Sequence, residues 1–155
     1  MSLVVDDQLG LLIRMDVLEL PTDIDLPLLT VYGFQIRLAL ALLAERRSTG
    51  VLQGLFARYG STIDDPEALL ASTDRVIALD SNALVGEVAL AKAELSCNLL
   101  AAEVVAAARH HDAPVRLAPG NASGQLAEVL ARSGVQASVW RFEKSGPRLR
   151  VVEEF

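Results

Sequence analysis

The sequence predicts an α/β domain of three layers, in which a mostly parallel sheet of about four strands lies between helices and a β-hairpin follows. Three observations lead to this prediction. Residues 2–6 form a short run rich in β-branched residues, typical of a buried strand. Residues 115–139 show the order strand, loop, helix, glycine, strand, a βαβ unit whose strands should be parallel. Residues 139–152 alternate on both sides of 144–147 and predict the hairpin.

Length and composition fit one folded domain over residues 1–155. Hydrophobic residues make up 52% and charged residues 22%, which excludes global disorder. The net charge of −6 argues against a mainly electrostatic nucleic-acid binder. A single cysteine, Cys97, excludes a disulfide scaffold or a multi-thiolate zinc site.

No membrane segment or signal peptide is visible, so we expect a soluble, cytoplasmic protein. The longest aliphatic run, 38–44, is far shorter than the roughly 20 residues that a membrane span needs. A chain this apolar for its size also favours a partner surface, and a homodimer is one form that this surface could take.

The other elements of the first half follow from hydrophobic spacing and from breakers. We expect loops at 20–23 and 26–27, where proline interrupts the chain. The expected helices are 8–17, a buried helix 29–47 closed by Gly50, 52–59 broken by Gly60, and one starting at Asp65-Pro66.

The second half gives clearer signals. A stripe of Leu84, Val88, Ala91 and Leu95 predicts a helix after a short strand at 75–79. The remaining predictions are helix 98–109, strand 115–118, loop 119–124, helix 125–132 and strand 135–139.

Glu103 is the most informative residue of the chain. Its helical neighbours three and four positions away are all apolar, so its carboxylate should face the core or a cleft. A buried carboxylate requires a cation, hydrogen bonds or a proton. Arg37, Arg46 or Arg109 could supply the cation, or the side chain could tilt to solvent.

A second acid, Asp6, closes the first predicted strand. Open α/β sheets place their sites outside the carboxyl ends of the strands. If Asp6 and Glu103 meet there, a divalent cation between them relieves their repulsion, and carboxylate oxygens suit Mg²⁺ or Mn²⁺. Asp6 and Glu103 are therefore the candidate metal ligands.

These segments resemble the PIN domain, the fold of many metal-dependent ribonucleases, including the toxins of bacterial toxin–antitoxin pairs. The run Leu3-Val-Val-Asp6 is similar to the first strand of that family, which ends in its first catalytic Asp. Residues 95–139 resemble the family's ending, in which a helix with the third acid precedes a strand, a loop with a fourth acidic or polar ligand, a helix and a Gly-Val strand. The match covers these two parts of the chain.

The departures from the family concern its acids. Glu103 stands where the family mostly has Asp, and Gly33 stands where the second acid usually lies. The usual Asp of the loop is missing, and Asn121 or Ser123 is nearest its place. Asp7, Asp80 or Glu87 could compensate, although the sequence does not place them.

The resemblance implies a divalent-metal-dependent ribonuclease of toxin–antitoxin type with a weakened acidic site. Asp6, Glu103 and Asn121 would be the catalytic residues, with Mg²⁺ or Mn²⁺ polarising the scissile phosphate of RNA and activating water. An antitoxin-like protein would be its partner. The alternative is a catalytically inactive PIN-like module that binds protein or nucleic acid, and the sequence leaves open whether the chain is an enzyme.

Other candidate residues have simpler explanations. The arginines at 37, 46, 47, 141, 148 and 150 could bind a phosphate backbone, but each is more simply a solvated side chain. His110 and His111 end a predicted helix, where helix capping is expected. Ser123 is a candidate N-cap of the helix that follows it, and Cys97 a buried thiol.

Overall fold

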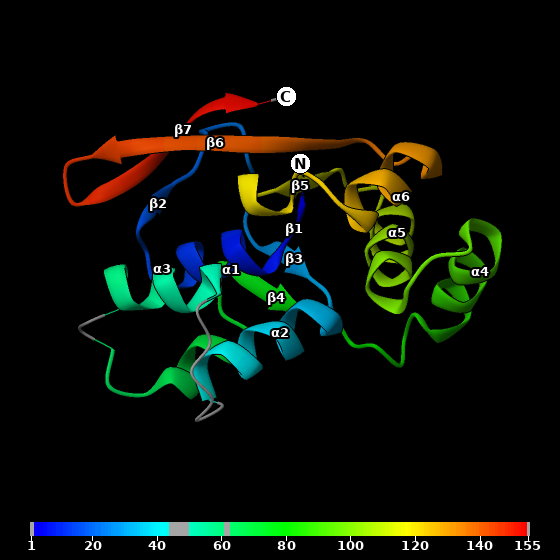
Figure 1. Ribbon diagram of the computed structural model, residues 1–155, viewed down its shortest axis with the longest axis horizontal. Coiled ribbons are helices and arrows are strands. Elements are labelled where there is room, and N and C mark those ends of the chain that lie inside the picture. The colour runs from blue at the N-terminus through cyan, green and yellow to red at the C-terminus, as the bar shows by residue number, and fades with distance from the viewer. Residues whose placement is uncertain (1, 44–49, 61–62, 155) are drawn as a thin grey trace.

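The computed structural model describes residues 2–43, 50–60 and 63–154 and shows an α/β fold (Figure 1). The strands are β1 (Val4–Val5), β2 (Leu18–Glu19), β3 (Leu28–Thr30), β4 (Val76–Ala78), β5 (Val115–Leu117), β6 (Ala137–Ser145) and β7 (Arg148–Glu154). The helices are α1 (Asp7–Arg14), α2 (Tyr32–Leu43), α3 (Val51–Tyr59), α4 (Val85–Leu95), α5 (Leu99–His111) and α6 (Gln125–Ser133), with the short 3-10 helices η1 (Pro66–Leu70) and η2 (Pro119–Asn121).

One mixed sheet runs through the molecule in the order β2-β7-β6-β5-β1-β3-β4. The strand β1 lies between β3 and β5 and is parallel to both of them. The predicted βαβ unit is confirmed, because β5 and β6 are parallel and α6 connects them. The carboxyl ends of β1, β3 and β5 therefore meet at one edge of the sheet.

The predicted sheet of about four mostly parallel strands was too simple. The described residues form seven strands, and the longest pairing, β6 with β7, is antiparallel. This pairing is the predicted C-terminal hairpin, which turns at Gly146 with a positive φ of 65°. The strand β2 has only two residues and pairs only with β7, so its local sequence carries almost no strand pattern.

The predicted buried helix 29–47 was wrong in two respects. Residues 28–30 form the strand β3, since a short apolar run is compatible with a strand or a buried helix until tertiary pairing decides. The helix α2 that follows buries Phe34 and Leu38 but exposes Leu40 by 62%. The predicted end of that helix lies outside the described residues, and Gly50 begins α3 instead.

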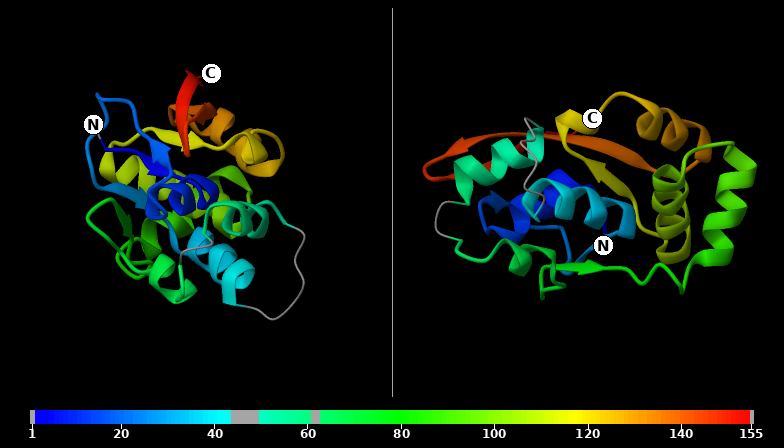
Figure 2. Two further views of the ribbon diagram at one scale, coloured as in Figure 1. Left: turned by 90° about the vertical axis from the view of Figure 1, so that its left-hand side faces the viewer. Right: turned by 60° about the horizontal axis from the view of Figure 1, so that its bottom comes forward.

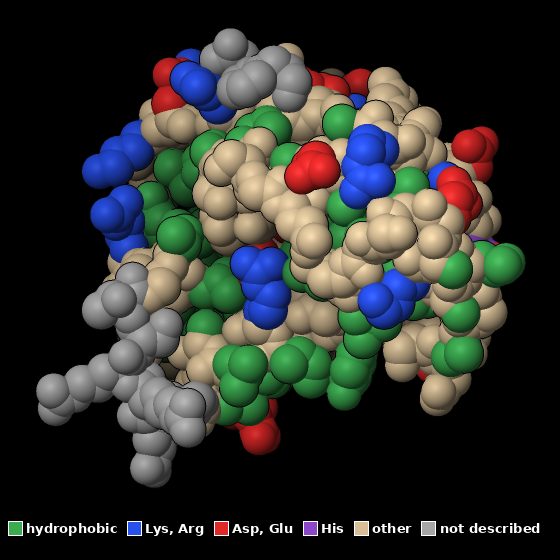
Figure 3. All heavy atoms as spheres, turned by 45° about the vertical axis from the view of Figure 1, so that its right-hand side comes forward, with side chains coloured by type: hydrophobic (Ala, Val, Ile, Leu, Met, Phe, Trp, Pro, Cys, Tyr) green, Lys and Arg blue, Asp and Glu red, His purple; other side chains and the backbone are tan. Residues whose placement is uncertain are grey.

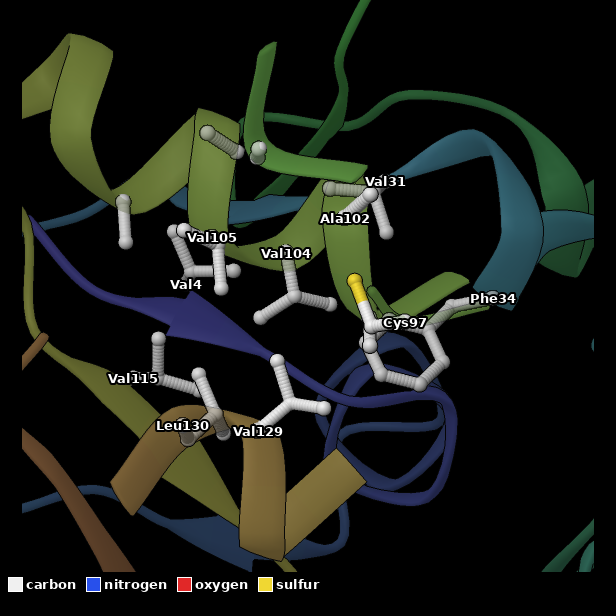
Figure 4. Close-up of a cluster of buried hydrophobic side chains, with 14 of the residues drawn as sticks. Val4, Val31, Phe34, Cys97, Ala102, Val104, Val105, Val115, Val129 and Leu130 are labelled. Atoms are coloured by element: carbon white, nitrogen blue, oxygen red, sulfur yellow. The ribbon is translucent and has the colours of Figure 1, made fainter. Parts of the chain in front are cut away.

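Helices cover both faces of the sheet. Neighbouring residues of β1 point to opposite faces, and each is buried against a different set of helices. Val4 belongs to a core cluster with α5 and α6, which Figure 4 shows around Val104, Val115 and Val129. Val5 belongs to a second cluster with α1 and the hairpin, which includes the fully buried Trp140. A smaller third cluster joins α1, α2, α3 and η1. The site described below lies where these layers meet at the sheet edge.

The ends of the elements follow their local sequence. The side chain of Asn98 accepts a hydrogen bond from the backbone N–H of Ala101 at 2.8 Å and caps α5. Gly134 takes the left-handed conformation that ends α6, with a φ of 79°. The expectation that Ser123 caps α6 was wrong, because Gly124 occupies the N-cap position without a side-chain bond.

The hairpin turn and α4 lie at opposite ends of the molecule, as Figures 1 and 2 both show. The helix α4 stands at the outer side of α5, and its exposed surface includes Val85 and Leu90. Among the described residues, no helix combines the length and apolar character that crossing a membrane demands.

Candidate functional site

Two of the polar residues singled out by the sequence, Asp6 and Asn121, lie together at the edge where β1, β3 and β5 end. Asp6 follows β1 directly and is also the N-cap of α1. Asn121 lies in η2, four residues after the end of β5. Gly33 lies in the first turn of α2, shortly after β3. The topology thus brings three distant segments to one place, as expected for an open α/β sheet.

Asp6 is fully buried, and the chain itself provides its hydrogen-bond donors. Its Oδ1 accepts from the backbone N–H of Leu9 at 2.8 Å, and its Oδ2 accepts from the backbone N–H of Ala118 and the Asn121 side chain, both at 2.7 Å. Burial raises the pKa of Asp6 to about 6, with a further increase from the charge of Asp7 and opposing contributions from these hydrogen bonds. Asp6 therefore ties α1 to the turn that follows β5.

Asp7 brings a second carboxylate to the same place and has a positive partner. Its side chain is fully buried, and its Oδ1 accepts from Asn121 at 3.1 Å. Its Oδ2 accepts no well-aligned hydrogen bond but lies 3.1 Å from Nε of Arg37. The Arg37 guanidinium also donates to Oδ1 of Asn121 at 3.5 Å and lies 5.8 Å from the ring centre of Phe34. The protein thus places its own cation beside the acidic pair.

The carboxylate of Glu103 lies in a different environment from that of Asp6. Its side chain is buried, and burial raises its pKa, while a hydrogen bond from the backbone N–H of Gly33 lowers it. That N–H is one of the first in α2, which have no partner within the helix, and the positive end of the helix dipole favours a carboxylate there. Glu103 therefore caps α2 from a neighbouring helix, which explains how an apolar stripe tolerates a carboxylate.

Gly33 and Glu103 fit each other in size. A Cβ atom added at Gly33 would lie 2.8 Å from Oε1 of Glu103 and 2.7 Å from Cδ1 of Leu100. Both distances are shorter than ordinary contacts, so any side chain at position 33 would displace these atoms. The long glutamate thus occupies the room that a side chain at position 33 would need.

The structure brings Asp6 and Asn121 together but does not join Glu103 to them. Asp7, Arg37 and Asn121 line a cavity of about 490 Å³ beside the start of α3. Glu103 lines another cavity, of about 400 Å³, between α2, α4 and α5. Gly33, which binds Glu103, and Arg37, which pairs with Asp7, lie about one turn apart on the same face of α2, a rise of about 6 Å.

The three acids that could compensate for the missing ligands, Asp7, Asp80 and Glu87, lie in different parts of the structure. Asp80 lines a small cavity together with Glu103, and its Oδ1 accepts from the backbone N–H of Asn82 at 2.9 Å. Glu87 lies 2.9 Å from Nδ1 of His110, which lies in the last turn of α5, so this contact links α4 to α5. Only Asp7 of the three lies beside Asp6.

The arginines considered for phosphate binding are mostly engaged with acids. Arg148 lies 3.1 Å from Asp16, and Nη2 of Arg150 lies 2.6 Å from Glu143. Arg109, a suggested partner of Glu103, makes two hydrogen bonds of 3.1 Å to Glu94 instead. Arg46 and Arg47 lie outside the described residues.

Sequence reasoning missed the pairing of Asp7 with Arg37. The two residues are thirty positions apart, and only the packing of α2 against α1 brings them together. The doublet Asp6-Asp7 was the available signal, since adjacent acids at a buried strand end call for a neutralising partner. Within the described part of the chain, no three or more His, Cys, Asp or Glu side chains are arranged to hold a metal ion.

Comparisons with family models, with curated proteins and with solved structures found no match for this chain.

Proposed function

We propose that this chain is a catalytically inactive PIN-like module that acts by binding, with a protein as its partner. The observation that carries the proposal is the position of Arg37. Its guanidinium lies 3.1 Å from the buried Asp7 and donates to Asn121, which in turn donates to Asp6. In the PIN-like interpretation this is the cluster that would attract a divalent cation, and here a side chain supplies the positive charge.

The donors around the acids support the same conclusion. A carboxylate offers about four lone-pair sites, and N–H groups already occupy three of those of Asp6. A cation at Asp7 would have to displace Arg37, and Glu103 accepts from the start of α2. These residues do not fit a Mg²⁺ or Mn²⁺ ion without rearrangement.

The order of elements supports the PIN-like part of the proposal. The first strand ends at Asp6, and the helix of Glu103 precedes β5, the turn with Asn121, α6 and a strand entered after Gly134-Val135. This is the order on which the resemblance depends. In this proposal the domain keeps the order of elements of the family, and its buried acids stabilise the folded structure instead of binding a metal ion.

The surface favours a protein partner over RNA. One side of α2 exposes Tyr32, Ile36, Leu40 and Leu43, spaced four, four and three residues apart as on a single helical face. Hydrophobic side chains also reach the surface at the lower and right edges of Figure 3. The net charge is −6, and Arg148 and Arg150 of the hairpin are paired with acids, which weakens the case for these two residues as contacts to a phosphate backbone.

A metal-dependent ribonuclease, regulated by an antitoxin-like partner, is the second candidate. Two observations favour it: Asp6 is fully buried with a pKa of about 6, and burial raises the pKa of Glu103 as well. Acids with perturbed pKa values are enriched at active sites, although structural acids share this property. In this candidate Asp6, Glu103 and Asn121 keep the roles that the resemblance implies.

The experiment that separates the candidates is a calorimetric titration with Mn²⁺ followed by an RNA degradation assay. Wild type, Asp6→Asn and Glu103→Gln are compared, with Glu128→Gln, an exposed acid on α6, as the matched control. We expect no Mn²⁺ binding in wild type beyond that of the two site variants, and no RNA cleavage. Mn²⁺ binding or RNA cleavage that both site variants abolish and Glu128→Gln retains would overturn the proposal in favour of the ribonuclease.

A further inference from the structure

The cavity that Glu103 lines has the composition of a small-ligand pocket. It measures about 400 Å³, within the range of roughly 300–1,000 Å³ that is usual for such pockets. Its walls are mostly apolar and come from Tyr32, Val85, Val88 and Leu99. Tyr32, Val85 and Leu99 remain more than half exposed, so the apolar walls continue to the mouth of the cavity.

The charged residues that line this cavity are Glu103 and Lys92. Glu103 is 7% exposed and has no cationic side chain as a partner among the described residues. A small second cavity shares Tyr32, Ser81, Val88 and Glu103 with the first and adds the carboxylate of Asp80. The basic group of the lining is Lys92, whose Nζ donates to the carbonyl oxygen of Cys97 at 2.9 Å and is thereby held toward the turn between α4 and α5.

We propose that this cavity binds a small apolar cation, an alkylammonium or amidinium group carried on a hydrocarbon body. The hydrocarbon would contact Val85, Val88 and Leu99, and the cationic head would pair with Glu103. Glu103 accepts one backbone N–H, from Gly33, which stabilises its carboxylate without neutralising the charge. Among apolar walls, such a carboxylate favours a positive head over a neutral or negative one. This inference does not depend on the resemblance to PIN domains.

The test compares three ligands with the same hydrocarbon chain. Hexylammonium, hexan-1-ol and hexanoate are titrated into the full chain and followed by NMR shifts of the Val85 and Leu99 methyl groups. We expect hexylammonium to bind at least tenfold more tightly than hexan-1-ol, and hexanoate to bind most weakly. Equal affinities for the amine and the alcohol, or no binding of any of the three, would overturn the proposal.

Three variants locate the effect. Glu103→Gln should reduce the affinity for hexylammonium to that for hexan-1-ol, while Glu128→Gln should leave both unchanged. Ala89→Phe, on the exposed side of α4, places a large ring at the cavity wall and leaves the Glu103 carboxylate in the chain. It should abolish binding of all three ligands, which keeps the proposal testable if Glu103→Gln unfolds. Retention of hexylammonium binding in Ala89→Phe would contradict the assigned cavity.

Asp6→Asn distinguishes the amine pocket from the proposed function of the domain. Asp6 lies outside this cavity, so Asp6→Asn should leave hexylammonium binding intact. Mn²⁺ binding that Asp6→Asn removes would overturn the inactive module and leave the amine pocket standing. Hexylammonium binding that Asp6→Asn removes would contradict the pocket assigned here.

Discussion

Three kinds of contact stabilise the buried acids Asp6, Asp7 and Glu103. Asp6 accepts three N–H groups, Asp7 pairs with Arg37, and Glu103 accepts from the start of α2. Each arrangement lowers the free-energy cost of burying a carboxylate, which is otherwise several kcal/mol. The acids thus have structural roles that can be measured one residue at a time.

Asp6 should make stability depend on pH. Its pKa is about 6 in the folded state against 3.8 as the ordinary value, so the folded state binds the proton more tightly. The resulting stabilisation is complete below 3.8 and is lost as the pH rises through about 6. Urea unfolding of wild type and Asp6→Asn between pH 4 and 7 measures it. The stability of wild type relative to the variant should fall with rising pH by on the order of 3 kcal/mol. A constant or rising difference would contradict this assignment.

The fit between Gly33 and Glu103 predicts a coupling in a double-mutant cycle. In wild type, Gly33→Ala should lower the free energy of unfolding by about 1–2 kcal/mol, since the new Cβ meets Glu103 and Leu100. In a Glu103→Asp background the shorter acid removes one of these two close contacts while the contact with Leu100 remains, so the loss should be smaller by about 0.5–1 kcal/mol. Chemical denaturation of the four proteins measures the coupling. An effect of Gly33→Ala that is the same in both backgrounds would show that the two residues do not compete for space.

At the level of elements, helix caps give a matched comparison. Asn98 caps α5 through the N–H of Ala101, whereas Ser123 precedes α6 without capping it. We therefore expect Asn98→Ala to lower the free energy of unfolding by about 1 kcal/mol and Ser123→Ala to change it by less than about 0.5 kcal/mol. Thermal and urea unfolding of both variants check this. A larger loss in Ser123→Ala than in Asn98→Ala would contradict the assignment of the caps.

Sequence patterns predicted some elements better than others, for physical reasons. The helices around Leu95 and Glu103 and the βαβ unit were predicted because their periodicity and breakers are local. The strand β3 was missed because its three buried residues, Leu28–Thr30, are followed almost directly by α2. The strand β2 was missed because it is a strand only through its pairing with β7. A segment of two or three residues is too short to show the alternating pattern of a strand, so a strand that depends on pairing with a distant segment is not predictable from it.

The candidate site was predictable to the same extent. Asp6 was expected at the carboxyl end of a strand, where Glu103 could meet it, and the resemblance placed Asn121 or Ser123 in the loop after a later strand. In the structure Asn121 donates a hydrogen bond of 2.7 Å to Asp6, whereas Glu103 lines a different cavity from Asn121. The separate cavity of Glu103 and the pair of Asp7 with Arg37 depend on how α2 packs, which periodicity does not encode. The predicted Mg²⁺ or Mn²⁺ ion and the ribonuclease activity stay predictions.

For the whole molecule, the hairpin is expected to unfold together with the rest of the chain. The one tryptophan, Trp140, is fully buried in a core shared by Leu3, Val5 and Leu149, and its indole N–H donates to Glu154 at 3.2 Å. Its fluorescence and the far-UV circular dichroism should therefore give the same melting transition. A fluorescence change that precedes the loss of helix would show that the hairpin is a separate folding unit.

We propose that Arg37 and the N–H donors stabilise the acids at this sheet edge well enough that no divalent cation binds there. Paramagnetic broadening of backbone amide NMR signals by substoichiometric Mn²⁺ measures this, because the broadening depends on the distance to the ion. The amides of Leu9, Gly33 and Ala118, which donate to Asp6 and Glu103, should be broadened no more than amides beside exposed acids such as Glu128. Selective loss of those three signals, restored by Asp6→Asn, would contradict it.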